Sequence, residues 1–502
     1  MLSPGAELVL VPEKAVAGGS MLARHEGRVV FVRGGIPGER VRARVERVSR
    51  DSAHAVAIDV IEPHADRRHP VVDPVCGGNA FAHIAYNRQL SLKAEIIADA
   101  FARLARLPVP HPISVAPSPE RGYRMRARFH VRGERAGFYR EGTHELCDPT
   151  TSGQLQPEAI EVVQAIARLL HEASVESGDV LGIELAENIA ADMRAVHVEL
   201  RTDRLADRLT SLGTIEGLTG LSWSLVSNAR TQVVAGSPYV LDGLDIRPLE
   251  VPGATAALGA PLVSERAEPS SLGLGRFRPS MNSWRPEPVE GRIAAASRDE
   301  ARRSESGESG HHSESDVQPI RLRRHVRAFF QGNRYLLSEL VGRVLSLIPE
   351  GPVIDLYAGV GLFAVALTST RPDDVRAVEA DAISATDLTA NAATCRRPFS
   401  AHHLSVEEFL RQSRGIPSHT VVLDPPRTGL SRDAAAGIGH HQPQRIVYVS
   451  CDVATLARDV KIFADAGYRL VHVEAFDLFP NTAHIETIAV LDRSQAGTSF
   501  ME

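Results

Sequence analysis

The stretch that most constrains the fold of this chain is 445–459, where an apolar run ends abruptly at Cys451 and a helical pattern follows. The run over 445–449 predicts a buried strand, and Asp452 or Thr455 is placed to cap the helix. α/β enzymes hold reactive groups at the carboxyl ends of their strands, and a helix N-terminus lowers the pKa of a thiol. We therefore expect an α/β domain that presents Cys451 as a nucleophile, with a structural cysteine as the alternative.

Three other segments repeat the pattern of a buried strand that ends in polar or glycine residues. P-V-I-D-L-Y-A-G-V-G-L-F-A contains Gly359 and Gly361, which allow a close approach of the backbone to a ligand. D-V-R-A-V-E-A-D ends in Glu379, placed to hold the hydroxyls of a ribose. These two segments predict a nucleoside-bearing cofactor and also fit a loose dinucleotide fingerprint. T-V-V-L-D-P-P-R then places Asp424 before a rigid Pro-Pro loop, which favours S-adenosylmethionine as the cofactor.

Composition limits the class of protein. The chain has 502 residues, of which 43% are hydrophobic and 24% charged, so we expect about three soluble domains. No run of about eighteen apolar residues predicts a membrane span, and the N-terminus does not resemble a signal peptide. The net charge of -6 requires any nucleic-acid binding to rest on local basic patches. The four cysteines are far apart, and we expect a reducing, cytoplasmic setting without a disulfide framework.

The segments before the α/β domain predict contacts with nucleic acid. Short alternating strands over 6–62 are typical of a small OB-like barrel, and a row of arginines from Arg40 to Arg44 lies on one face of its third strand. A second strand, R-M-R-A-R-F-H-V-R, places Arg124, Arg126 and Arg128 on one face without an evident acidic partner. We expect this row to bind phosphates, with a solvated face as the alternative. Residues 264–318 are rich in Ser, Arg, Glu, Gly and Pro, which predicts disorder.

Several motifs in order resemble the uracil-5 RNA methyltransferases. They are F-F-Q-G-N, D-L-Y-A-G-V-G-L-F-A, V-E-A, D-P-P-R-T-G-L, S-C-D-V-A-T-L-A-R-D and F-P-N-T-A-H-I-E. The resemblance implies a class I methyltransferase domain over 319–494, with a doubly wound, Rossmann-like sheet of about seven strands. It also implies a TRAM domain, an OB-like barrel, over 1–62 and a central α/β RNA-binding domain over 63–263. Tyr468–Phe476 and Thr487–Asp492 are then expected to pair antiparallel at one edge of the sheet.

The resemblance also implies roles for single residues. Cys451 matches the family's nucleophile, which adds to the base, and Glu486 matches the base that removes the C5 proton. The implied cofactor is S-adenosylmethionine, and the implied substrate is a uridine of ribosomal or transfer RNA. The enzyme itself is expected to be a monomer. The remaining matched positions hold cofactor or target base: Gln331, Asp424, Tyr357, Gly359, Gly361, Glu379 and, against the base, Phe329.

One departure from the family and two alternatives remain. Many relatives hold an iron–sulfur cluster with a C-x5-C-G-G-C core, but Pro70 and Asn79 replace two of those cysteines here. Since a cluster needs about four thiolates, we expect no cluster and no other metal site. The first alternative is another methyltransferase, either an RNA cytosine-5 methyltransferase, which normally carries a cysteine in the Pro-Pro region, or an amino-methyltransferase, which would carry N/D-P-P-Y/F and need no cysteine. The second is an RNA-binding relative with little or no activity.

Overall fold

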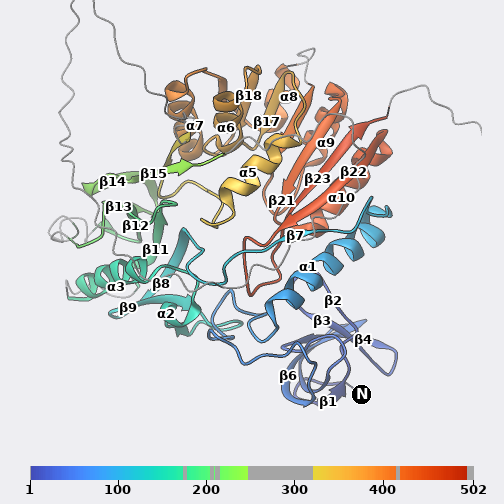
Figure 1. Ribbon diagram of the computed structural model, residues 1–502. Helices are drawn as coiled ribbons and strands as arrows, with labels where there is room; N and C mark the ends of the chain where they lie inside the picture. Colours follow the sequence, from blue (N-terminus) through green and yellow to red (C-terminus); the bar gives the residue numbers. More distant parts are fainter. Residues whose placement is uncertain are drawn as a thin grey trace, which may run out of the picture. The chain divides into compact units, whose positions relative to one another are not determined.

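The computed structural model describes residues 2–172, 178–203, 209, 215–246, 320–413 and 419–494. The segment predicted to be disordered, 264–318, lies outside the described residues. The described residues contain four sheets of six, seven, two and eight strands (Figure 1). No described helix is both long and apolar enough to cross a bilayer.

The N-terminal sheet is built from alternating strands, as the sequence predicts. Its strand order is β1-β5-β6-β4-β3-β2, and β5 buries Val41, Ala43 and Val45 between exposed residues. The arginines of that exposed face each pair with a carboxylate of a neighbouring strand, as Arg42 does with Asp59 at 2.5 Å. The strands are β1 Glu7–Leu10, β2 Lys14–Ala15, β3 Met21–His25, β4 Arg28–Arg33, β5 Arg40–Val48 and β6 Ser52–Glu62.

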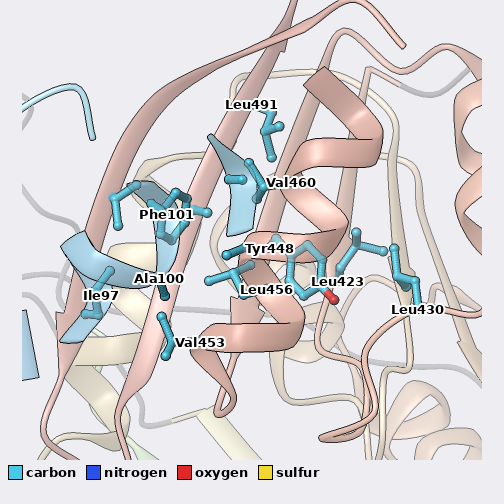
Figure 2. Close-up of a cluster of buried hydrophobic side chains, with 14 of the residues drawn as sticks. Ile97, Ala100, Phe101, Leu423, Leu430, Tyr448, Val453, Leu456, Val460 and Leu491 are labelled. Carbon is cyan, nitrogen blue, oxygen red and sulfur yellow. The ribbon is translucent and has the colours of Figure 1, made fainter. Parts of the chain in front are cut away.

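A helix then crosses to the C-terminal half of the chain. The helix α1 (Tyr86–Ala100) and the π-helical turn η1 (Phe101–Ala105) bury apolar side chains against α10 (Val453–Asp465), the helix that follows Cys451. Figure 2 shows Ala100 and Phe101 beside Val453, Leu456 and Val460. Burial of this apolar surface, worth roughly 25 cal/mol per Å², fixes the back of α10 and therefore the turn that carries the cysteine.

The central sheet has the strand order β10-β9-β8-β11-β12-β13-β14. The helix α3 buries Val163, Ile166 and Leu170 in the core of this domain. Only β12 and β13 pair in parallel. The elements are β8 Arg126–Arg132, β9 Arg135–Tyr139, β10 Leu146–Cys147, α2 Pro149–Ser152, α3 Pro157–Glu172, β11 Val180–Glu187, β12 Arg194–Leu200, β13 Gly220–Leu225 and β14 Asn228–Gly236.

The cysteines of this domain correct one prediction. Cys76 and Cys147 form a disulfide, with Cα atoms 5.7 Å apart. The expectation of no disulfide rested on sequence separation, which is 71 residues here and does not limit contact in the folded chain. Cys147 pairs with Phe138 of β9, and Cys76 forms an isolated bridge with Arg140 just beyond β9. The same strand therefore brings both cysteines together.

The two ends of the undescribed segment meet in a two-stranded ribbon. β15 (Tyr239–Leu244) pairs antiparallel with β16 (Ile320–His325), and Leu244 is the register partner of Ile320. Leu244 and Ile320, on either side of this segment, therefore lie next to each other.

The C-terminal sheet is doubly wound, with strand order β19-β18-β17-β20-β21-β23-β22-β7. The seven predicted strands are present, and β22 and β23 pair antiparallel at one end, as expected. The two-residue strand β7 (Val115–Ala116) adds an eighth beside β22, which the sequence did not indicate. The other strands are β17 Val353–Leu356, β18 Val375–Glu379, β19 Ser400–His403, β20 Thr420–Leu423, β21 Arg445–Ser450, β22 Tyr468–Phe476 and β23 Glu486–Arg493.

Alternation along the strands explains the two helical layers. In β21, Ile446 and Tyr448 belong to the core cluster that includes α8, α9 and α10, whereas Val447 and Val449 belong to the cluster that includes α5, α6 and α7. Successive side chains of a strand point to opposite faces, so each face of the sheet is covered by its own helices (Figure 1). The helices are α5 Leu337–Ser346, α6 Leu362–Thr370, α7 Ala382–Thr394, α8 Val406–Gln412, α9 Arg432–His441 and α10.

Candidate active site

The carboxyl ends of four parallel strands bring the predicted residues to one edge of the C-terminal sheet. Leu356 of β17 is the register partner of Val378 and of Leu423, and Leu423 is that of Tyr448. The residues that follow these strands are therefore neighbours along the edge. They are Glu379 at the end of β18, Tyr357 after β17, Asp424 after β20 and Cys451 after β21.

Cys451 and Glu486 lie opposite each other across an antiparallel pair. Ser450, the last residue of β21, is the register partner of Thr487 in β23. Cys451 follows Ser450 and Glu486 precedes Thr487, so the thiol and the carboxyl extend the same pair by one position. Residues 35 positions apart in sequence are thus adjacent at the end of two hydrogen-bonded strands.

Glu486 is a buried carboxyl group without a protein partner. Its residue is 1% exposed, and neither carboxylate oxygen has a hydrogen-bond partner. Burial, and next the charge of Asp424, raise the pKa of Glu486 well above its usual value, while Arg427 opposes the shift. An unpartnered buried carboxyl group is costly, and such groups in a cluster with shifted pKa values mark functional sites.

The environment of Cys451 corrects the predicted direction of its pKa shift. Burial, and then the charges of Glu486 and Asp424, raise the pKa of the thiol to about 11, although Arg427 lowers it. The first amides of α10 are already bonded within the protein, since Asp452 caps the helix and accepts hydrogen bonds from the amides of Ala454 and Thr455 at 3.0 and 2.9 Å. The expectation of a lowered pKa for Cys451 is therefore wrong.

The glycine turn after β17 leaves an open space bordered by acids. At Gly359 a side chain would meet nothing within 4 Å, and its amide donates to Glu379 Oε2 at 2.8 Å. Gly361 begins α6 with φ +94°, and a Cβ there would approach Leu388 Cδ1 to 2.8 Å. Any other residue at position 361 would strain the backbone and clash with Leu388, so a glycine is required there. At Gly359 the absence of a side chain leaves the backbone accessible to a ligand.

Asp355 is a site residue that the predicted set omitted. It lies within the buried strand β17, and only one of its oxygens, Oδ2, accepts a hydrogen bond, from the amide of Ala364 at 3.1 Å. Burial, and next the charge of Asp424, raise its pKa to about 8. The signal was a single charged residue in an otherwise apolar buried strand, V-I-D-L.

Gln331 and Asp424 contact each other directly. The Gln331 amide Nε2 donates to Asp424 Oδ2 at 3.1 Å, which opposes the effect of burial that raises the pKa of Asp424 to about 7. Gln331 itself is 5% exposed, whereas Phe329 is 61% exposed. An exposed aromatic ring beside a buried amide is suited to contact a base that enters from outside.

The segment that carries Phe329 and Gln331 is held from both sides. Asn333 is buried, donates from Nδ2 to Ser118 Oγ at 2.8 Å and accepts from the amides of Tyr335 and Leu336. Arg334 forms a buried ion pair with Glu187 at the end of β11. These contacts fix the segment between the central and C-terminal sheets.

The Pro-Pro loop is attached to the helix that follows Cys451. Asp459 of α10 accepts hydrogen bonds from the amide of Leu430 at 2.8 Å and from the hydroxyl of Tyr448 at 2.7 Å. Arg458 Nη2 donates to the carbonyl of Thr428 at 3.0 Å. The loop that carries Asp424 and Arg427 and the helix that follows Cys451 are therefore braced as one piece.

Arg427 is a second residue that the predicted set omitted. It is exposed, yet its charge lowers the pKa of both Cys451 and Glu486. The motif D-P-P-R contained the signal, but nothing in the sequence indicated that its arginine faces the cysteine.

The predicted arginine row is not free of acidic partners. Arg126 pairs with Glu184 of β11 at 3.0 Å, and Arg128 pairs with Glu199 of β12 at 2.5 Å. The assumption behind that prediction was wrong because the partners lie on two other strands of the sheet, β11 and β12. Arg124 differs, since it donates to Gln154 Oε1 and joins none of the ion pairs found within the described ranges.

The region of the family's iron–sulfur site does not fit a cluster in this chain. Cys76 and Cys147 are bonded to each other. Asn79 is buried and donates from Nδ2 to the carbonyls of Asp73 and Ser152 at 2.9 and 3.2 Å, so its amide already ties the loop together. In the parts of the chain that the structure covers, no three His, Cys, Asp or Glu side chains group as metal ligands.

Comparisons with known proteins agree with this architecture. Residues 316–494 match the family described as tRNA (Uracil-5-)-methyltransferase, and residues 7–58 match the TRAM domain. An uncharacterized RNA methyltransferase of Thermosynechococcus vestitus is 28% identical over 98% of this chain and 99% of its own length. The 23S rRNA (uracil(1939)-C(5))-methyltransferase RlmD of Methylococcus capsulatus is 26% identical over 95% of this chain and 94% of its own.

A solved structure shares the fold. It is the tRNA (uracil-54, C5)-methyltransferase of Pyrococcus abyssi in complex with S-adenosyl-L-homocysteine, with a TM-score of 0.65 and 21% identity. The match covers 96% of this chain and 99% of that one. The order of the sheets along the chain is therefore that of a known architecture.

Proposed function

We propose that this chain, which is similar to TRAM-domain uracil-5 RNA methyltransferases, methylates C5 of one uridine in RNA through a covalent adduct on Cys451. The observation that carries the proposal is the pair formed by Cys451 and Glu486 at the ends of β21 and β23. A nucleophile and a carboxyl group side by side, the latter without a protein partner, are what addition to a base and proton removal from it require.

Each member of the pair has a distinct role. C5 of uracil is a weak nucleophile. Cys451 adds to C6 as the thiolate, after its proton has left to water, and this addition makes C5 electron-rich enough to accept a methyl group. Glu486 then removes the C5 proton, which allows the sulfur to leave. The raised pKa of Glu486 means that its carboxylate, once ionised, binds a proton strongly. That property suits a group that takes a proton from carbon.

S-adenosylmethionine fits the edge of the sheet beside this pair, where it supplies the methyl group when bound. Glu379 is placed to hold the ribose, and Gly359 offers an accessible backbone next to it. Asp355 has an oxygen without a partner in the same region. Tyr357 and Gly361 shape the turn, with φ values of 62° and 94°. Gln331 and Asp424 hold polar groups of cofactor or base, and Phe329 stacks on the base.

The substrate is RNA, and both ribosomal and transfer RNA are open, since one similar protein is named for 23S rRNA and another for tRNA. The test is methyl transfer by the purified protein to both RNA pools from a strain that lacks the gene, followed by mass spectrometry of the nucleosides. The expected product is 5-methyluridine in one pool. Formation of 5-methylcytidine, or of no methylated nucleoside, would contradict the proposal and favour one of the two alternatives.

A further inference from the structure

A small cavity lies beside the catalytic pair and is not used by the proposed reaction. It measures about 260 Å³, and its walls include Tyr139, Arg124, Arg427, Phe479 and His484. The residues assigned to the cofactor do not line it. Its volume is below the range of ~300–1,000 Å³ that is typical of sites for drug-sized ligands, so it suits a single flat ring rather than a whole cofactor.

The walls combine flat rings with positive charge. Tyr139 and His130 stack on each other, with ring centroids 3.7 Å apart and planes at 13°. Phe479 and His484 contact each other edge to face across 6.0 Å. Stacked aromatic rings of this kind form platforms for unpaired bases.

Two arginines supply the charge without a competing carboxylate. Arg124 and Arg427 both line the cavity, and neither takes part in an ion pair between residues that the structure describes. Arg124 uses Nε for the carbonyl of Arg126 and Nη1 for Gln154 Oε1, which leaves its third nitrogen for a ligand. Guanidinium groups bind phosphate oxygens strongly.

The cavity is held in shape before any ligand binds. Gln154 Nε2 donates to the carbonyl of Gly77 at 2.8 Å, and the amide of Gly77 donates to the carbonyl of Tyr139. Gly78 has φ +92°, and a Cβ there would lie 2.7 Å from Gln154 Nε2. The disulfide of the adjacent Cys76 to Cys147 fixes the same loop against β9 and β10.

Arg427 connects this cavity to the catalytic pair, because it both lines the cavity and interacts with Cys451. We propose that the cavity binds the unpaired nucleotide next to the target uridine, with its base against Tyr139 and its phosphate on Arg124 and Arg427. This inference rests on the proposed function, since the target uridine must reach Cys451. The base has to be unpaired, because the rings can stack only on a base that has left its helix.

The experiment is a double cross-link on a short single-stranded oligouridylate. Its central residue is 5-fluorouridine, and S-adenosylmethionine is present as the methyl donor. After methyl transfer to C5 this residue remains bonded to the cysteine, because the fluorine at C5 cannot be removed as a proton is. Both neighbours of the central residue are 4-thiouridine, which cross-links under ultraviolet light. Mass spectrometry of the digested complex then reads the two attachments separately. The proposal predicts an adduct on Cys451 and a cross-link on the peptides that carry Tyr139, Phe479 or His484.

The outcomes separate the two proposals. An adduct on Cys451 with flanking cross-links only on other peptides would overturn the nucleotide cavity and leave the proposed function intact. Absence of any adduct would overturn the proposed function, and the cavity assignment with it.

A matched pair of variants tests whether the stacking itself matters. Tyr139→Leu should raise the KM for RNA about tenfold, since stacking contributes about 1–3 kcal/mol per base, while Tyr139→Phe keeps the ring and the wild-type KM. An abasic residue at the cross-linked position should raise the KM of the wild-type protein by a similar factor and leave the KM of Tyr139→Leu unchanged. If the abasic residue raises the KM of both proteins equally, Tyr139 only supports the fold and the assignment is wrong.

Discussion

At the scale of single residues, the chemistry is set by a few charges around one thiol. The charges of Glu486 and Asp424 add to burial in raising the pKa of Cys451, and Arg427 works against them. Cys451 is therefore held as a thiol at neutral pH. Since the thiolate is the reactive form, the raised pKa slows the reactions of this partly exposed side chain.

This balance predicts the alkylation rate of Cys451 by iodoacetamide. Only the thiolate reacts, so the rate should rise about tenfold per pH unit up to a pKa near 11. Arg427→Ala removes a charge that lowers the pKa and should slow alkylation at a given pH, whereas Glu486→Gln should accelerate it. Cys395, whose pKa is raised by burial, is an internal reference in the same mass spectrum. Alkylation rates equal to that of the wild-type protein in both variants would show that these charges do not act on the thiol.

The sequence predicted most of the site residues but not their electrostatics. The position of Cys451 after a buried strand was readable because an apolar run ends at one place. The direction of its pKa shift was not readable, because Glu486 comes from a strand that pairs only in the folded sheet. Asp355 was missed although it is a charged residue within an otherwise apolar buried strand.

At the scale of elements, neighbouring strands change what a row of side chains can do. The alternation in β5 and β8 was predicted correctly, but the carboxylates of β6 and β11 lie opposite their arginines. A pattern within one strand gives no information about the strand beside it until the register is known. The same limit explains the disulfide between Cys76 and Cys147 and the added strand β7.

The ion pairs predict unequal effects within the row Arg124, Arg126 and Arg128. Arg124→Ala should weaken RNA binding and reduce the slope of log K against log salt by about 0.7–0.9, the effect of one lost phosphate contact. Arg126→Ala should change that slope less, because its guanidinium already pairs with Glu184. Titrations of labelled RNA at several salt concentrations give the slopes. Equal slopes for both variants and the wild type would show that the row is only a solvated face.

The disulfide predicts the number of reactive thiols. Under denaturing, non-reducing conditions two thiols, Cys395 and Cys451, should react with a thiol reagent. After reduction all four cysteines should react, and the melting temperature of the reduced native protein should fall, since a bridge typically contributes about 2–4 kcal/mol. Cys147→Ser should leave Cys76 as a third reactive thiol. Four reactive thiols before reduction would contradict the bridge.

At the scale of the whole chain, the sheets follow one another in the order that the sequence predicted. Two strand-rich regions precede the doubly wound sheet, and the proposed catalytic residues come from the C-terminal sheet. Alternating patterns identified the N-terminal sheet, and βα units identified the last. The central region gave only partial signals, because its strands pair mostly with distant segments whose register cannot be read locally. The predicted boundaries between domains remain predictions.

The ribbon of β15 and β16 makes a prediction about the segment between them. Deletion of Glu268 to Ser313 with a short linker should leave methyl transfer within a few-fold, because Leu244 and Ile320 are already register partners. A deletion that also removes β16 is the control and should destabilise the protein, since Arg323 and Arg324 of β16 pair with Asp387 and Asp242. Loss of stability in the shorter deletion would show that this segment is part of the core.

The central claim is that Cys451 and Glu486 act in sequence on the same base. Glu486→Gln cannot accept the C5 proton, but the thiol can still add and the methyl group can still move, so a methylated protein–RNA adduct should accumulate. Cys451→Ala should form no adduct and transfer no methyl group. The measurement is gel electrophoresis of each variant with unmodified RNA and labelled S-adenosylmethionine. The account predicts a slow-migrating labelled band for Glu486→Gln alone, and normal turnover by either variant would contradict it.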